Sequence, residues 1–215
     1  MNEITKNYIQ ELKEREDVVG IILFGSWARG NNRPGSDVDL VVIVKEGYRR
    51  CFEERDGQVF EMIFTTAKSA LEFWTANRND AAGLWEVAEI LYEKDDVVSV
   101  IKKSTTEMLS SGKTLPDIHQ IGQWKFDAGD QIGYAEYLYE KDPVTADMIL
   151  SNKVFALTEV FFDLRGKWTP APKQRLSKIK EESEELSALI SQFWGVENNF
   201  TERVRVAREI IGVIF

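Results

Sequence analysis

The chain has 215 residues, a hydrophobic content of 43% and a formal net charge of −9. This length and composition predict one or two globular domains, and no apolar run approaches the roughly 20 residues that cross a bilayer. The acidic balance argues against a protein that follows a nucleic-acid backbone, because that affinity comes mainly from Lys and Arg. One cysteine and one histidine exclude an internal disulfide and a zinc site built from soft ligands. The polar start MNEITKNYIQ lacks the features of a secretory signal, so we expect a cytoplasmic protein without membrane contact.

The first half of the chain alternates helical and strand patterns. Apolar residues at helical spacing predict a helix in ITKNYIQELKER, and VVGIILF then predicts a short buried strand. Two further strands are predicted in DVDLVVIV and GQVFEMIFTT, followed by a helix in AKSALEFWTAN. The segment EVAEILYE fits either a last strand or the end of a helix, and residues 97–108 fit a linker helix.

The second half of the chain has an almost wholly helical pattern. The long candidate helices span 117–141, 143–166, 171–194 and 199–214. This change of pattern predicts two domains, 1–112 and 113–215. The expected fold class is α+β, with a mixed β-sheet and flanking helices in the first domain and an all-α helical bundle in the second.

Two aspartates one residue apart interrupt the apolar strand DVDLVVIV. Side chains at positions i and i+2 of a strand point the same way, about 6.6 Å apart, so the carboxylates of Asp37 and Asp39 converge. A divalent cation would remove the cost of two buried anions, and Mg²⁺ is expected because it combines carboxylates with phosphates and water. Gly25 and Ser26 lie where the preceding strand turns and can hold a phosphate. With Glu61 as a third inward carboxylate, the set indicates phosphoryl or nucleotidyl transfer.

The stretch FGSWARGNNRPGSDVDLVV closely resembles the signature of the DNA polymerase β-like nucleotidyltransferase superfamily. The shared features are Gly-Ser, a gap of about ten residues, Asp-apolar-Asp and a later acid on another strand. The GSWARG and GSDVD forms look most like small prokaryotic members, including minimal nucleotidyltransferases and enzymes that modify aminoglycosides or lincosamides. The motif match is specific across residues 20–65. It implies a nucleotidyltransferase palm as the first domain.

The resemblance also implies roles for individual residues. The expected catalytic and metal-binding residues are Asp37, Asp39 and Glu61, and the expected nucleotide-binding residues are Gly25, Ser26, Arg29 and Ser36. Mg²⁺ is the expected cofactor, and an NTP, ATP in the first instance, is the expected co-substrate. The third acid is Glu where many members have Asp. The alternatives are an ordinary edge-strand charge for Glu61 and a surface position on the short helix for Arg29.

The helical domain contains one informative stretch, WKFDAGDQIGYAEYL, in which acids and aromatics share a helical stripe. The functional interpretation makes Asp127, Asp130 and Tyr134 part of an acceptor pocket, because a cationic acceptor would need anionic and aromatic contacts. The alternative is a bundle helix whose aromatics pack and whose acids are solvated.

The sequence therefore predicts a Mg²⁺-dependent enzyme that moves a nucleoside monophosphate from NTP to a hydroxyl and releases pyrophosphate. The expected acceptor is a small antibiotic-like molecule or metabolite in a cleft between the domains. Two alternatives are a hydroxyl on a partner protein, as the resemblance to antitoxin-type minimal nucleotidyltransferases allows, and a non-catalytic nucleotide-binding module. The general base is either Glu61 or an acid of the helical domain. No nucleic-acid partner is expected, and a homodimer is compatible with the sequence.

Overall fold

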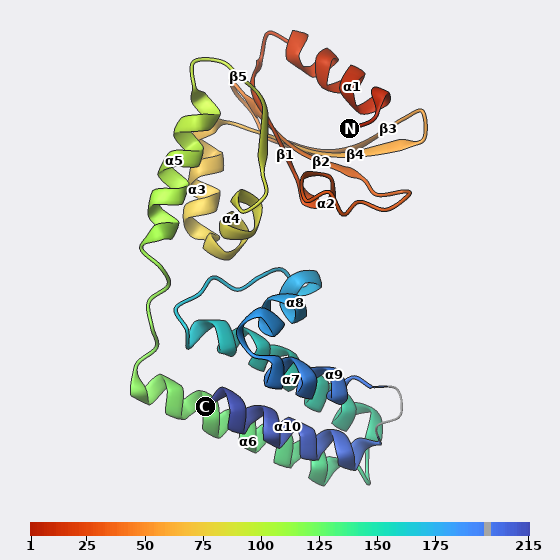
Figure 1. Ribbon diagram of the computed structural model, residues 1–215, viewed down its shortest axis with the longest axis vertical. Coiled ribbons are helices and arrows are strands. Elements are labelled where there is room, and N and C mark those ends of the chain that lie inside the picture. Colours follow the sequence, from red (N-terminus) through yellow and green to blue (C-terminus); the bar gives the residue numbers. More distant parts are fainter. Residues whose placement is uncertain (196–198) are drawn as a thin grey trace. The chain divides into compact units, whose positions relative to one another are not determined.

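The computed structural model describes residues 1–195 and 199–215 and divides into two compact units, Met1–Ser111 and Gly112–Phe215. The first unit combines a β-sheet with helices, and the described part of the second unit is helical (Figure 1). This confirms the predicted α+β fold class. In the described part of the chain, no helix has both the length and the apolar character of a membrane span.

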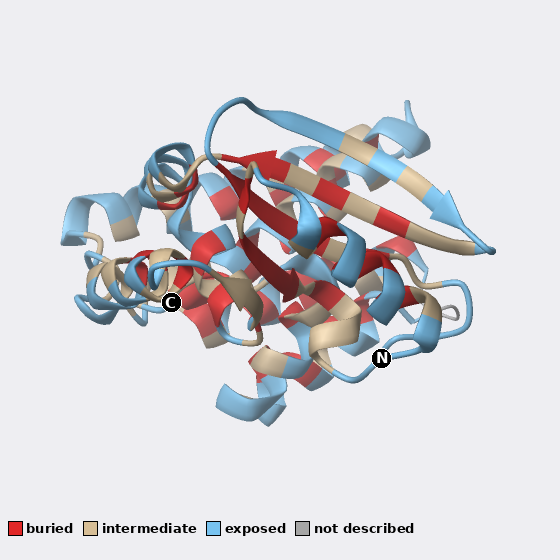
Figure 2. Cartoon of the chain, turned by 90° about the horizontal axis from the view of Figure 1, so that it is seen from above, coloured by how far each residue is buried: buried red, intermediate tan, exposed pale blue. Residues whose placement is uncertain are grey.

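The first unit is built on a mixed sheet with the strand order β3-β4-β2-β1-β5. The strands are β1 Val18–Phe24, β2 Val38–Val44, β3 Arg49–Arg55, β4 Gln58–Thr65 and β5 Glu89–Glu93. Strand β2 runs parallel to β4, and the other neighbouring pairs are antiparallel. Figure 2 shows the central strands largely buried and an edge strand largely exposed, and the exposed strand is β3. The sheet therefore places β2, which carries the Asp-x-Asp motif, in its interior.

Helices cover both faces of this sheet (Figure 1). They are α1 Glu3–Glu14, α3 Ala67–Ala76, α4 Arg78–Trp85 and α5 Val97–Ser110, while the short α2 Gly25–Ala28 follows β1. Because side chains alternate along a strand, Leu40 and Val42 pack with α1, whereas Val41 and Ile43 pack with α3, α4 and α5. The same alternation places Asp39 on the face of β2 that carries Val41.

Several elements of the first unit differ from the sequence-based predictions. Strand β3 was not predicted, because RRCFEER is charged and lies at the sheet edge, where no apolar alternation is required. Helix α4 was also not predicted, and the ambiguous segment EVAEILYE contains strand β5. The predicted linker helix is α5, whose Val98 and Ile101 are buried in the core of the first unit. It is therefore a structural element of that unit.

The second unit has a core of apolar side chains from all its described helices. They are α6 Ile118–Leu138, α7 Pro143–Asp163, α8 Pro172–Glu182, α9 Glu184–Phe193 and α10 Phe200–Ile214. The single helix predicted over 171–194 is wrong, because Ser183 ends α8 and its side chain accepts a hydrogen bond from the Leu186 N–H at the start of α9. Trp194, at the C-terminal end of α9, is 48% exposed.

Candidate active site

The strand register explains why three acids far apart in sequence meet at one place. On β2, Asp39 lies opposite Phe24, the last residue of β1, and on the other side it lies opposite Glu61 of β4. Directly opposite residues of paired strands point to the same face of a sheet. The side chains of Asp39 and Glu61 therefore lie side by side, and Asp37 lies two residues before Asp39, directly ahead of the start of β2 at Val38.

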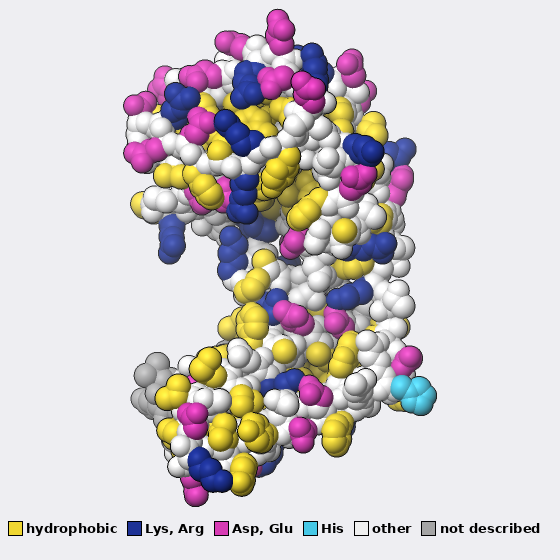
Figure 3. All heavy atoms as spheres, turned by 180° about the vertical axis from the view of Figure 1, so that it is seen from behind, with side chains coloured by type: hydrophobic (Ala, Val, Ile, Leu, Met, Phe, Trp, Pro, Cys, Tyr) yellow, Lys and Arg dark blue, Asp and Glu magenta, His cyan; other side chains and the backbone are white. Residues whose placement is uncertain are grey.

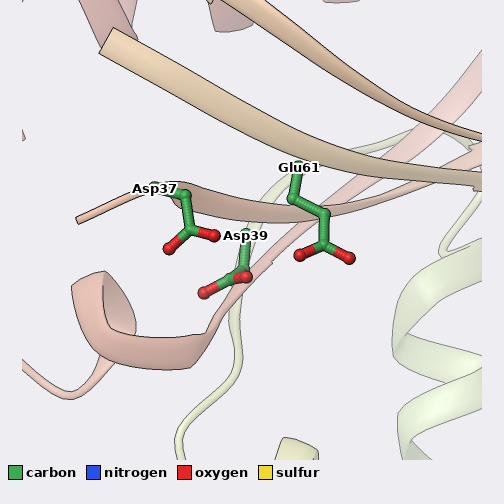
Figure 4. Close-up of side chains that lie close together, drawn as sticks. All are labelled: Asp37, Asp39 and Glu61. Carbon is green, nitrogen blue, oxygen red and sulfur yellow. The ribbon is translucent and has the colours of Figure 1, made fainter. Parts of the chain in front are cut away.

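The side chains of Asp37, Asp39 and Glu61 form a carboxylate cluster, in which one oxygen from each lies within 4.8 Å of the others. Figure 4 shows the three groups approaching one another from β2 and β4. All three residues are partly buried, so the carboxylates remain accessible to a ligand. Oxygen ligands of this kind suit a hard divalent cation such as Mg²⁺. The structure thus brings together the three acids that the sequence singled out.

The turn that follows β1 lies directly against this cluster. Gly25 begins α2 with φ +71°, a left-handed conformation that favours glycine. A Cβ atom at Gly25 would lie 1.8 Å from Asp39 Oδ2 and 2.6 Å from Asp39 Cγ. Only glycine allows the chain to turn here without displacing the carboxylate, so the Gly-Ser motif and the Asp-x-Asp motif depend on each other sterically.

The residues around this turn are held by specific contacts. The guanidinium of Arg29 donates to the carbonyl oxygens of Gly25, at 3.4 Å, and of Gly83 in α4, at 2.9 Å. It therefore connects the turn to α4. Ser26 is partly buried, and its carbonyl oxygen accepts the N–H of Asn31 at 3.1 Å.

The segment that leads into β2 is held by a similar set of contacts. The carbonyl oxygen of Ser36 accepts hydrogen bonds from Gln58 Nε2, at 2.9 Å, and from Trp27 Nε1, at 3.4 Å. The Ser36 hydroxyl oxygen accepts the backbone N–H of Arg33 at 3.0 Å. Ser36 therefore fixes the approach to Asp37, and its hydroxyl is engaged within its own loop.

One residue of the site was missed from the sequence. Arg50 of β3 donates from Nε to Glu61 Oε1 at 2.8 Å, and its Nη2 contacts the same oxygen. Arg50 could not be assigned without β3. A usable signal was present, because Asp56 directly precedes the predicted strand, which begins at Gly57, and Asp-Gly is a strong hairpin signal. Both residues have positive φ, at 50° and 80°, as a type I′ hairpin turn requires.

The acids predicted to bind the acceptor lie on α6 in the second unit. Asp127, Asp130 and Tyr134 are spaced by three and four residues and are exposed, Tyr134 at 50%. Asp127 forms an ion pair with Lys153 of α7. This spacing places the three residues on one side of α6, with Asp130 at the edge of the stripe that contains Asp127 and Tyr134.

The visible surface carries charges of both signs. On the face shown in Figure 3, Lys and Arg side chains are interspersed with Asp and Glu side chains. A nucleic-acid interface is expected to concentrate Lys and Arg on one face or along one helix. The mixed charge of this face accompanies a net charge of −9 for the whole chain.

Comparison with known proteins agrees with this geometry. Residues 5–110 match the nucleotidyltransferase domain family. Two Methanocaldococcus jannaschii proteins, each named as a candidate protein adenylyltransferase, are similar over short stretches. One is 47% identical over 47 residues, which are 21% of this chain and 32% of that protein. The other is 40% identical over 58 residues, which are 26% of this chain and 67% of that protein. The chain therefore matches about a third of the first relative's length.

A solved structure is similar over almost the whole chain. It is a nucleotidyltransferase-like protein from Exiguobacterium sibiricum, with a TM-score of 0.51 and 14% identity. The match covers 99% of this chain and 73% of that one, and it supports the fold. The family match is consistent with the carboxylate cluster and with the Gly25 turn beside it. The chain therefore belongs to the nucleotidyltransferase family, in the DNA polymerase β-like group that its motifs resemble.

Proposed function

We propose that this protein is a Mg²⁺-dependent nucleotidyltransferase that moves a nucleoside monophosphate, AMP in the first instance, from NTP to an acceptor hydroxyl. The observation that carries this proposal is the carboxylate cluster beside the Gly25 turn. A phosphate-binding turn and a cation site in contact are what transfer from a nucleoside triphosphate requires. Without the turn, the three acids would indicate only a cation site.

The residues present fit the proposed cation. Asp37, Asp39 and Glu61 offer carboxylate oxygens close enough to share one ion, and such oxygens are the ligands that Mg²⁺ prefers. When bound, Mg²⁺ would neutralise charge that develops on the phosphates during transfer. We assign these three residues as its ligands.

In this proposal, Gly25 and Ser26 bind the nucleotide, and Arg29 and Ser36 hold the neighbouring backbone in place. Gly25 lets the phosphates approach the backbone closely, and Ser26 donates its hydroxyl to a phosphate oxygen. Arg29 acts by holding the turn through the Gly25 carbonyl, and Ser36 holds the segment that presents Asp37.

The proposed transfer replaces a phosphoanhydride bond of the NTP with a phosphoester bond to the acceptor. The acceptor hydroxyl oxygen forms a bond to the α-phosphorus, and the bond from that phosphorus to the oxygen bridging to the β-phosphate breaks. Pyrophosphate leaves, and the hydroxyl proton passes to a base. Glu61 is one candidate base, because its carboxylate lies at the end of the cluster on β4, and an acid of the second unit is the other.

We propose a small hydroxylated molecule, antibiotic-like or a metabolite, as the acceptor, bound with the help of Asp127, Asp130 and Tyr134. Their shared exposed face on α6 supports this proposal, because it offers carboxylates and an aromatic ring to a cationic or polyhydroxylated ligand. The variant Asp130→Asn should weaken acceptor binding and leave NTP binding unchanged. Glu140→Gln is a suitable control, because Glu140 is an exposed acid beyond the end of α6. Equal transfer by both variants and the wild type would contradict this assignment.

A second candidate acceptor is a hydroxyl of a partner protein. The names of the two archaeal relatives favour it, because both describe protein adenylyltransferases. The matched stretches are only 47 and 58 residues long, so the whole chain need not share the relatives' acceptor.

Both acceptors can be tested in one experiment. The protein is incubated with Mg²⁺, each of four labelled NTPs and either a panel of metabolites and antibiotics or a cell extract. A labelled small molecule of increased mass would support the first acceptor, and a labelled polypeptide would support the second. Asp39→Asn serves as the inactive control. Nucleotide binding without a Mg²⁺ requirement and without transfer to either pool would instead indicate a non-catalytic nucleotide-binding module.

A further inference from the structure

Arg50 makes a directed contact with the third acid of the cluster. In the β3–β4 pairing, Phe52 lies opposite Glu61, so Arg50 lies two residues away on the same face of the sheet. Both its Nε and its Nη2 reach the same oxygen, Glu61 Oε1. The Arg50 side chain is 56% exposed, whereas that of Glu61 is 15% exposed. The contact therefore reaches from the exposed edge strand to a largely buried metal-site carboxylate.

This contact engages only one oxygen of the carboxylate. Among the described residues, no group donates a hydrogen bond to Glu61 Oε2. In Figure 4, one oxygen of Glu61 lies on the side of Asp39 and the other points away from it. A planar guanidinium that donates two hydrogen bonds to one oxygen restricts the rotation of the carboxylate group, and it leaves the second oxygen available to bind a cation.

The charge of Arg50 also suits a site that contains a cation. Three carboxylates and one divalent cation leave a single negative charge, which a neighbouring guanidinium balances. Arg50 would repel the cation slightly while holding one of its ligands in place. Whether it helps or hinders cation binding depends on which effect is larger.

Solvent exposure limits the repulsion. The Arg50 side chain is 56% exposed, so water and salt screen its repulsion of the cation. Loss of a residue that orients a metal ligand typically costs about 10–100-fold in metal affinity or activity. Positioning is therefore expected to outweigh repulsion.

We propose that Arg50 is the positioning residue of the cation site, acting through Glu61. This inference rests on the proposed function for the identity of the site, and it adds a residue from the edge strand that neither the sequence motif nor the family match assigns. In this proposal, β3 contributes to the cation site as well as forming the edge of the sheet.

Arg49 provides a matched control on the same strand. It is 59% exposed, like Arg50, but it points to the opposite face, where it pairs with Glu53 and lies over the Phe64 ring at 5.1 Å. Removing either arginine takes one exposed positive charge and one ion pair from β3. Only the removal of Arg50 touches the carboxylate cluster.

The test is a double-mutant cycle read by Mn²⁺ binding, with Mn²⁺ alone titrated by electron paramagnetic resonance. The proteins are wild type, Arg50→Met, Arg50→Lys, Arg49→Met, Glu61→Gln and the double variant Arg50→Met with Glu61→Gln. We expect Arg50→Met to weaken Mn²⁺ binding several-fold to about tenfold, Arg50→Lys to lie between it and the wild type, and Arg49→Met to have no effect. In the Glu61→Gln background, Arg50→Met should cause no further weakening, because no carboxylate remains to be positioned. Thermal unfolding of each variant checks that the first unit remains folded.

Several outcomes would overturn the inference. Tighter Mn²⁺ binding by Arg50→Met would mean that repulsion dominates, and equal losses in Arg49→Met and Arg50→Met would mean a general effect of β3. If Arg50→Met weakened Mn²⁺ binding as much in the Glu61→Gln background as in the wild type, Arg50 would act independently of Glu61. The proposed function is judged separately by nucleotide transfer in the wild type: coupling without transfer would reject that function alone, and transfer without coupling would reject the role of Arg50 alone.

Discussion

Replacing Gly25 by alanine should inactivate the site by displacing the carboxylate of Asp39, which lies on β2. Gly25 has φ +71°, and an added Cβ would lie 1.8 Å from Asp39 Oδ2. The left-handed backbone alone costs about 1–2 kcal/mol for a residue with a side chain. The overlap must be relieved in addition, and the atom in the way is the carboxylate itself. We expect Asp39 to shift by on the order of 1 Å, a displacement that can cost about 10²-fold in rate.

Gly30 separates these two effects. Its φ is +70°, almost the same as that of Gly25, but an added Cβ there meets no atom within 4 Å. Gly30→Ala should therefore lose the same 1–2 kcal/mol of stability and keep its activity. The difference between the two variants isolates the steric conflict with Asp39.

The assay compares Gly25→Ala, Gly30→Ala and the wild type in thermal unfolding, Mn²⁺ titration and transfer from labelled ATP. The melting temperature should fall in both variants, and at least as far in Gly25→Ala as in Gly30→Ala, whereas Mn²⁺ binding and transfer should fall only in Gly25→Ala. Equal transfer by the two variants would refute the reasoning, because it would show that Asp39 does not need the space that Gly25 leaves.

Three further predictions follow from individual contacts. Asp39→Asn should keep the fold and lose transfer by a factor of ~10² or more, measured with labelled NTP, and near-normal turnover would reject the mechanism. Ser26→Ala should weaken binding of a non-cleavable ATP analogue by about 1 kcal/mol, the net value of one hydrogen bond, as measured by calorimetry; unchanged affinity would place the phosphates elsewhere. Hydrogen bonds from the Ser99 hydroxyl and backbone N–H hold the pKa of Glu93 below its usual value. The ionised Glu93 therefore stabilises the folded state at pH values above its unfolded-state pKa, and this contribution is lost as pH falls through the folded-state pKa. Glu93→Gln should therefore lower the melting temperature at neutral pH more than in strong acid, and an effect independent of pH would contradict this.

The parts of the fold that sequence predicted well are those in which burial dictates the pattern. Strand β2 is apolar on both faces because helices cover both sides of it, so its pattern stands out. The edge strand β3 is exposed and carries charges on both faces, so its residues show no comparable pattern. The break between α8 and α9 was missed because Ser183 lies within the charged run EESEE, which reads as a continuous solvated helix face.

The candidate site shows the same division. Spacing alone was enough to bring Asp37 and Asp39 together, and the inward position of Glu61 followed from its own strand. The contact between Arg50 and Glu61 depends on the pairing of β3 with β4, and pairing register is a tertiary property that the local pattern of β3 does not encode. The roles of Asp127 and Asp130 in acceptor binding remain predictions.

The parallel pairing of β2 with β4 also governs when the carboxylate cluster can form during folding. Asp37 and Asp39 are neighbours in sequence, so they meet as soon as their segment becomes extended. Glu61 joins them only after β4 has docked beside β2 across the intervening β3 segment, and such non-local pairing must first overcome loop-closure entropy. A partly folded chain that lacks this pairing has no complete cluster. Cation binding by all three acids therefore reports the formation of the native sheet as well as the readiness of the site.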